Sequence, residues 1–251
     1  MKGRIFSVVG GMFLLTVCSK GDRGAVQAAP PRTEVSAAGG TITGKIKFTG
    51  AAPRNPAIDM SEEAACKAKY TTPPTEENVV AGPANALSNV FVYVSAGVPA
   101  GQTFTAPTTP VVLDQSGCRY HPHVFGVMVG QTIEIKNSDP LLHNIKAIAK
   151  KNRPFNVSQP NANMTKTVTF AAPEVMVNLE CNVHGWMRAY VGVRPDPFFA
   201  VSKTDGSFTI SGLPPGTYTI EAWHEKFGTQ TATVAIAGTE TKTANFTFAA
   251  H

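Results

Sequence analysis

The amino-acid sequence predicts a mostly β protein, and three observations support this fold class. From Gly40 onward, apolar and polar residues alternate with a period of two, and β-branched and aromatic residues are frequent. Gly, Pro and Asn separate the alternating runs, as expected for turns between short strands. The chain has 251 residues, 43% hydrophobic and 16% charged, which is enough for one or two domains with cores of their own.

The N-terminal stretch has the composition of a secretory signal peptide. Lys2 and Arg4 precede an apolar run over residues 5–18, and the small residues of "VQAA" come just before two prolines. We therefore predict a signal peptide over 1–28, cut near Ala28, and a linker over 29–39. The mature protein is expected to be periplasmic or extracellular, without a transmembrane span.

Two alternatives to a cleaved signal peptide remain open. An uncleaved membrane anchor would need roughly 20 apolar residues, and the apolar run is shorter than that. A lipoprotein would carry its lipid on Cys18, but Val17 is bulkier than the small residue usually found before such a cysteine.

Charge gives little support for a nucleic-acid partner. The formal net charge of +5 falls to about +2 without the signal peptide, because that segment alone carries a net +3. A basic cluster stays in the mature chain, and it is either a solvated face or a surface that steers an acidic partner. Its members are Lys146, Lys150, Lys151 and Arg153.

The mature chain has an odd number of cysteines in an oxidising compartment. Export removes Cys18 and leaves Cys66, Cys118 and Cys181. Two of them can pair, and the third needs another reason to stay reduced. Metal ligation would be such a reason.

The predicted elements fall into three blocks. The first begins with a strand over 39–50 and ends with an apolar strand over 89–97. Between them, "DMSEEAACKAKY" (59–70) predicts a short helix or a helical loop carrying Cys66, with Ser61 as a candidate cap and lysines in the last turn. A second block from about 104 to 194 and a third from 198 onward are again rich in strands.

The third block resembles the carboxypeptidase regulatory-like domain, a small transthyretin-like β-sandwich. The residues that carry the resemblance are "TDGSFTISGLPPGTYTIEAWHEKFG", and "GTITGKIKFTG" at 40–50 matches the family's first strand. The resemblance implies a discontinuous sandwich over 40–99 and 196–249. We expect a second domain over 100–195 to be inserted in it, although two sandwiches packed side by side are the alternative.

Soft metal-ligand side chains occur in the middle block. The stretch "CNVHGWM" contains Cys181, His184 and Met187 at intervals of three, and His143 follows an alternating strand and a turn upstream. Two imidazoles, a thiolate and a thioether are the ligands of a type 1 (blue) copper site. The three downstream ligands must point to one spot, which requires a tight loop, and Gly185 is expected to give that loop its flexibility.

The spacing C-x2-H-x2-M resembles the short ligand loop of amicyanin, and the pair His143-Asn144 is also typical of cupredoxins. The resemblance covers roughly residues 104–194. It implies a Greek-key cupredoxin sandwich, one type 1 copper per chain, and Asn144 as a residue that ties the two ligand loops together.

Other metals fit the same residues less well. Zinc would use His143, Cys181 and His184, but Met187 would then be a coincidence. Haem attachment by C-x-x-C-H is absent from the sequence, and a dinuclear copper centre would need two cysteines in the loop. In the structural alternative, Cys181 and Met187 are core residues without a metal.

The remaining cysteines and histidines give two weaker hypotheses. A disulfide between Cys66 and Cys118 would fasten the inserted block to its host. In "YHPH", His121 and His123 are either a second metal site or surface and packing residues.

The function expected from these resemblances is one-electron transfer by an exported copper protein. Its partner would be a redox protein such as a cytochrome c or a dehydrogenase, docking near His184 and Trp186. The alternative is non-redox copper storage or delivery, or a metal-stabilised adhesion module. An enzyme is not expected, because no nucleophile context is found and six histidines hardly provide further copper centres.

Overall fold

The computed structural model describes residues 39–250, and within them the chain is nearly all β, as the sequence predicts. The predicted signal peptide with Cys18, and the linker up to residue 38, lie outside the described residues. Among the described residues, no helix combines the length and the apolar character needed to cross a bilayer.

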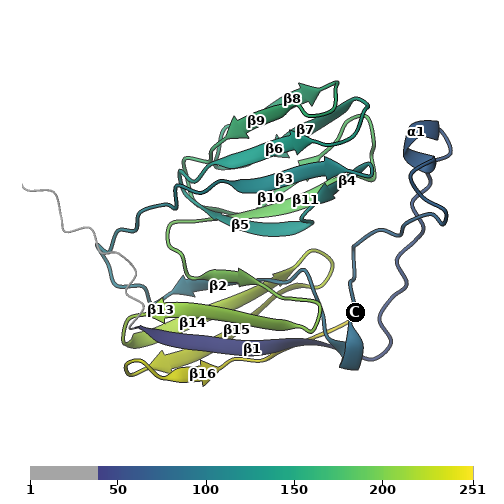
Figure 1. Ribbon diagram of the computed structural model, residues 1–251. Helices are drawn as coiled ribbons and strands as arrows, with labels where there is room; N and C mark the ends of the chain where they lie inside the picture. The colour runs from purple at the N-terminus through teal and green to yellow at the C-terminus, as the bar shows by residue number, and fades with distance from the viewer. Residues whose placement is uncertain (1–38, 251) are drawn as a thin grey trace, which may run out of the picture. The chain divides into compact units, whose positions relative to one another are not determined.

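Eight strands form two sheets with one shared core, here called the flanking sheets (Figure 1). The orders are β13-β1-β16, with β17 also paired to β1, and β12-β2-β14-β15. The strands are β1 (Gly40–Thr49), β2 (Phe91–Ala96), β12 (Phe199–Val201), β13 (Ser207–Leu213), β14 (Gly216–His224), β15 (Gly228–Ile236), β16 (Thr241–Thr243) and β17 (Phe246–Ala249). Along β1, buried positions alternate with exposed ones, as its period-two sequence requires.

Nine strands form two further sheets around a second core, here called the middle sheets. Their orders are β4-β3-β6-β9 and β5-β11-β10-β7-β8. The strands are β3 (Val111–Ser116), β4 (Arg119–His121), β5 (Val124–Met128), β6 (Ile133–Asn137), β7 (His143–Ile148), β8 (Phe155–Gln159), β9 (Thr165–Val168), β10 (Glu174–Glu180) and β11 (Arg188–Arg194). The flanking strands therefore come from both sides of the middle strands in the sequence, while the exact domain boundaries stay a prediction.

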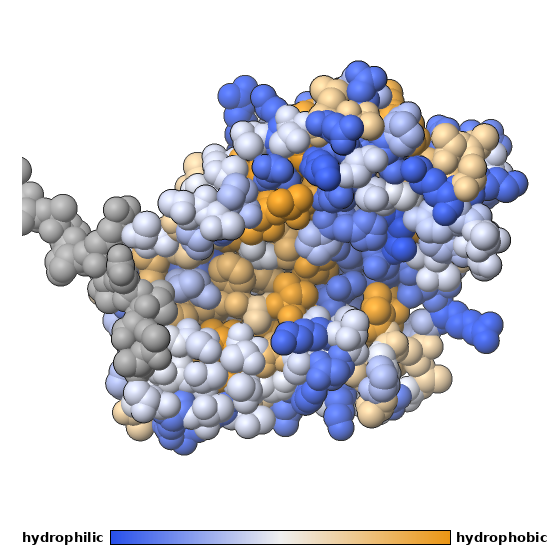
Figure 2. All heavy atoms as spheres, in the orientation of Figure 1, coloured by the Kyte–Doolittle hydropathy of each residue, from blue (hydrophilic) through white to orange (hydrophobic). Residues whose placement is uncertain are grey.

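Two glycines form a platform where the flanking and middle sheets meet. Gly126 on β5 and Gly192 on β11 are register partners, and the Phe91 ring of β2 lies against both. A Cβ at Gly192 would lie 2.3 Å from that ring, so no larger residue fits without movement. In Figure 2, hydrophobic residues are visible in the strip between the two groups of sheets.

The segment over residues 57–77, which we call the cap, lies outside all four sheets. It contains the helix α1 (Ala64–Lys67), and a second short helix, η1 (Pro83–Asn85), follows it before β2. The short helix predicted to carry Cys66 is therefore confirmed, but Ser61 is not its cap. Asp59 Oδ1 accepts a hydrogen bond from the Ser61 amide, so Ser61 lies in a turn and caps nothing.

Candidate metal centre

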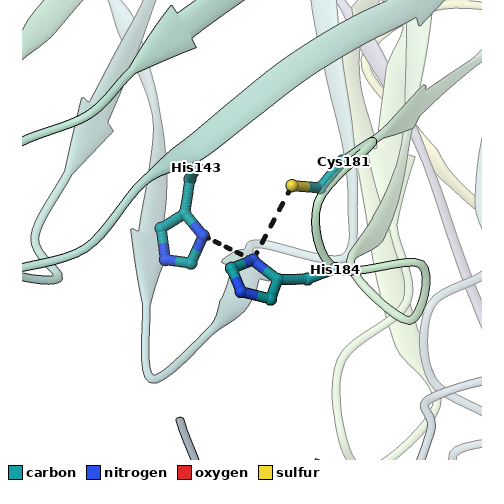
Figure 3. Close-up of side chains that lie close together, drawn as sticks. All are labelled: His143, Cys181 and His184. Atoms are coloured by element: carbon teal, nitrogen blue, oxygen red, sulfur yellow. Dashed lines mark hydrogen bonds between the residues drawn. The ribbon is translucent and has the colours of Figure 1, made fainter. Parts of the chain in front are cut away.

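Three of the predicted ligands converge at one end of the middle sheets (Figure 3). His143 begins β7, Cys181 directly follows β10, and His184 lies in the loop before β11. Their donor atoms all lie within 4.8 Å of one another. His143 Nδ1 is 2.9 Å from His184 Nδ1, and Cys181 Sγ is 3.8 Å from that same nitrogen.

The loop that carries Cys181 and His184 is closed by its own backbone. The Met187 amide donates to the His184 carbonyl at 2.8 Å, and the Cys181 amide donates to the Met187 carbonyl at 3.2 Å. Met187 is 1% exposed and belongs to the same apolar cluster as Cys181. That its sulfur is the fourth ligand stays a prediction.

Gly185 is not needed for the shape of this loop. A Cβ added there would meet no heavy atom within 4 Å, and its backbone lies outside the left-handed region. The expectation that glycine gives the loop a special flexibility therefore has no support in the geometry. The two backbone hydrogen bonds account for the tight turn.

Asn144 connects the two ligand segments. Its Oδ1 accepts a hydrogen bond from the Asn182 amide at 2.7 Å and lies 3.3 Å from Cys181 Sγ. Its Nδ2 donates to Asn156 Oδ1 at 2.7 Å on the neighbouring strand β8. The side chain therefore fixes the start of the Cys181 loop relative to His143.

Asp139 is a site residue that the sequence reasoning missed. Its Oδ2 lies 2.9 Å from His143 Nε2, and the carboxylate accepts hydrogen bonds from the amides of Gly117 and Cys118 and from Lys69 Nζ. Burial opposes its ionisation, but these donors outweigh it and hold the pKa of Asp139 well below its usual value. The available signal was a carboxylate four positions before a histidine, the pairing that orients metal-bound imidazoles.

The donors are suited to a cation of soft character. Burial raises the pKa of Cys181, but hydrogen bonds from His143 and His184 outweigh it and lower that pKa to about 5. A thiolate is the form that ligates metals. Two Nδ1 atoms that face each other at 2.9 Å must share one proton, or else share a cation with the thiolate.

The outer nitrogen of His184 is covered by the cap. Nε2 lies 3.8 Å from Cys66 Sγ and 3.6 Å from Glu63 Oε2, and the residue is only 1% exposed. This imidazole is therefore buried, and docking of a partner near His184 and Trp186 stays a prediction. Trp186 is half-buried and donates from Nε1 to the Cys118 carbonyl at 2.9 Å.

The structure joins Cys66 and Cys118 in a disulfide with an S–S distance of 2.01 Å. Both half-cystines are fully buried in the core of the middle sheets, so Cys66 packs there and not in the core of the flanking sheets. Among the described residues, Cys181 is left as the free cysteine.

The two histidines of "YHPH" do not join the site. His121 is exposed, whereas His123 is buried and its Nε2 lies 2.5 Å from Glu225 Oε1. Within residues 39–250, neither belongs to a group of side chains that could hold a metal ion. The structure shows His123 in an ion pair, which fits the packing alternative.

Fold and site thus define the class of this protein: it is nearly all β and has a buried set of one cysteine and two histidine donors. Residues 189–249, which include β12 to β17, match the family model of the carboxypeptidase regulatory-like domain. None of the curated proteins matches the sequence.

Solved structures similar to this chain include copper proteins. A Cu-containing nitrite reductase from Thermus scotoductus SA-01 is 22% identical, with a TM-score of 0.33 over 41% of this chain and 26% of its own. A mutant of amicyanin in the Cu(I) state is 18% identical, with a TM-score of 0.31 over 42% of this chain and 99% of its own. A purple cupredoxin from Nitrosopumilus maritimus is 21% identical, with a TM-score of 0.29 over 34% and 98%. The case for metal binding rests on the donor atoms themselves.

Proposed function

We propose that His143, Cys181 and His184 bind one copper ion per chain, and that Met187 would supply the fourth ligand. The observation that carries this proposal is the convergence of Cys181 Sγ and two imidazole Nδ1 atoms at a buried site. Two nitrogens and one thiolate with a weak thioether are the ligand set of type 1 copper.

Each neighbouring side chain has a definable role in this proposal. Asp139 accepts a hydrogen bond from Nε2 of His143, which would leave the lone pair on Nδ1 available to the metal. Asn144 holds the Cys181 loop in place. Bound copper would supply one-electron chemistry between Cu(I) and Cu(II), and these fixed ligands would keep rearrangement between the two states small.

The function that fits best is an exported one-electron carrier. Buried ligands on short, hydrogen-bonded segments favour retention of the metal, whereas delivery needs exchange. Export is supported by the Cys66–Cys118 disulfide, which is typical of oxidising compartments. The redox partner would be a cytochrome c or a dehydrogenase, and the protein itself is not proposed to be an enzyme.

The visible spectrum of the copper-loaded, oxidised protein tests the metal site. We expect an intense thiolate-to-copper band that Cys181→Ser abolishes, because this substitution removes the sulfur ligand and leaves both imidazoles. Met187→Leu is expected to keep the band, since an axial thioether interacts only weakly. A protein without the band, or a band that survives Cys181→Ser, would contradict the proposal.

Voltammetry separates a carrier from a storage or delivery protein. A carrier should give a reversible wave and exchange electrons quickly with a soluble cytochrome c, without losing copper over repeated cycles. Storage or delivery predicts slow exchange and copper release to a chelating acceptor. The second result would favour the non-redox alternative over electron transfer.

A further inference from the structure

The cap over residues 57–77 is an addition to the metal-site end of the middle sheets. In the sequence it lies between β1 and β2, which both belong to the flanking sheets. Its apolar residues Ile58, Met60 and Cys66 nevertheless pack in the core that also contains Cys181 and Met187. Figure 1 shows the chain rising from the flanking sheets to α1 and returning.

The cap reaches the outer side of both imidazoles. Cys66 Sγ and Glu63 Oε2 lie 3.8 Å and 3.6 Å from Nε2 of His184. On the other side, Lys69 Nζ binds Asp139 at 2.8 Å, and this carboxylate holds His143. With His143 and His184 at 0% and 1% exposure, a metal ion has no open approach past either imidazole.

The cap is fastened at a few points and has little regular structure. The Cys66–Cys118 disulfide and a hydrogen bond from Tyr70 Oη to the Gly117 carbonyl at 2.7 Å attach it to the turn between β3 and β4. Its own backbone has one helix of four residues and the isolated bridge between Ala57 and Thr75. Among the described residues, none of its backbone hydrogen bonds joins it to a strand of the four sheets. Segments outside the sheets open at lower free energy than strands within them.

We propose that the cap is a disulfide-fastened lid over the metal site, which must lift from His184 before a metal ion can enter or leave. This inference rests on the proposed metal site but not on the identity of the metal. The strands that carry His143 and Cys181 stay in place when the lid lifts, because their hydrogen bonds run within the middle sheets.

A dithiol reductant unfastens the lid by thiol–disulfide exchange. The Cys66–Cys118 bond breaks, two protein thiols form, and the reductant becomes a disulfide after giving two electrons and two protons. Because both half-cystines are buried, the reductant reaches the bond only when the lid has already moved. The rate of reduction therefore also reports how often the lid opens.

Acylation of histidines by diethyl pyrocarbonate, read by mass spectrometry on the metal-free protein, tests the lid. We expect His184 to be protected in the oxidised protein and to react at least tenfold faster in the double variant Cys66→Ser/Cys118→Ser. The exposed His121 serves as internal reference in every sample. Equal reactivity of His184 with the disulfide present and absent would overturn the proposal.

A second pair of variants covers the case in which loss of the disulfide unfolds the protein. Glu63→Gln/Lys69→Met removes the contacts with His184 and Asp139, whereas Glu62→Gln/Lys67→Met changes the same residue types at exposed neighbouring positions. The first variant should raise His184 acylation and the second should leave it unchanged. Identical behaviour of the two would contradict a lid.

Rates of copper uptake and of copper removal by a chelator separate this inference from the proposed function. Both rates should rise at least tenfold in the lid variants. If the blue band forms but the lid variants show unchanged rates of copper uptake and of His184 acylation, the copper site is supported and the lid is contradicted. If His184 acylation rises in the lid variants but the protein binds no copper, the lid is supported and the proposed function is contradicted.

Discussion

At the scale of single residues, Asp139 determines which nitrogen of His143 can face a metal. Its carboxylate holds Nε2, so the lone pair of the imidazole lies on Nδ1, the side of Cys181 and His184. An amide in its place could still accept one hydrogen bond, but it would lack the charge that favours a proton on Nε2.

Asp139→Asn is therefore expected to weaken copper binding by about 10- to 100-fold, the usual effect of losing such a partner. Competition with a chelator of known affinity measures the change. Asp59→Asn, at an exposed position of the cap, is the control and should leave the affinity unchanged. Equal affinities for the two variants would show that Asp139 does not orient His143.

Gly185→Ala is expected to change the free energy of unfolding by less than ~0.5 kcal/mol, as for other surface substitutions without special contacts. The space beside Gly185 is open and its backbone suits any residue. Urea unfolding of the metal-free protein and the visible spectrum of the copper form check this. Loss of the blue band would mean that the loop does require glycine.

The candidate ligands were visible in the sequence because three of them lie within seven residues, where the spacing itself constrains the geometry. Asp139 was also within reach of local reasoning, since it lies four positions before His143. Glu63 and Cys66 were not, because their contact with His184 joins segments that are 118 or more positions apart. No local pattern marks such a contact.

At the scale of elements, the glycine platform of β5 and β11 decides how closely β2 can approach. Gly192→Ala places a methyl group against the buried Phe91 ring, and overpacking of this kind costs about 1–3 kcal/mol. Urea unfolding should show that loss. Gly238→Ala, where a Cβ would meet nothing within 4 Å, is the matched control. An unchanged stability for Gly192→Ala would mean that the two groups of sheets separate easily.

Strands were easier to predict than their partners. Alternation identified β1 closely, because a half-buried strand must alternate, and a continuous apolar run identified β2. The parallel pairing of β5 with β11, which builds the platform, links segments more than 60 residues apart and leaves no periodic signal. The short α1 was predicted from its local charge pattern, but its cap at Ser61 was not found.

At the scale of the whole molecule, His123 joins three parts of the chain. It precedes β5 in the middle sheets, its Nε2 binds Glu225 after β14 of the flanking sheets, and its Nδ1 faces the Arg188 carbonyl and, at 4.0 Å, Glu77. Burial lowers its pKa, but the hydrogen bond to Glu225 and the two carboxylates outweigh it, so the pKa of His123 is raised.

A raised histidine pKa stabilises the fold below the unfolded value of about 6.5, and this contribution is lost as the pH rises through the folded value. The free energy of unfolding should therefore fall above neutral pH. We expect His123→Gln to flatten this fall, whereas His121→Gln, at an exposed position, should keep it. Urea unfolding at a series of pH values measures both, and equal curves for the two variants would exclude His123 as the cause.

The pairing of β1 has a consequence for the order in which the molecule folds. β1 is the first strand of the described chain, yet it pairs with β13, β16 and β17, and a hydrogen bond from Lys45 to Asn245 spans 200 positions. The strands around His143 and Cys181 are all present once residue 194 has emerged. A chain delivered from its N-terminus can thus complete the candidate metal site before β1 has formed its pairs, so the first strand to emerge is among the last to be paired.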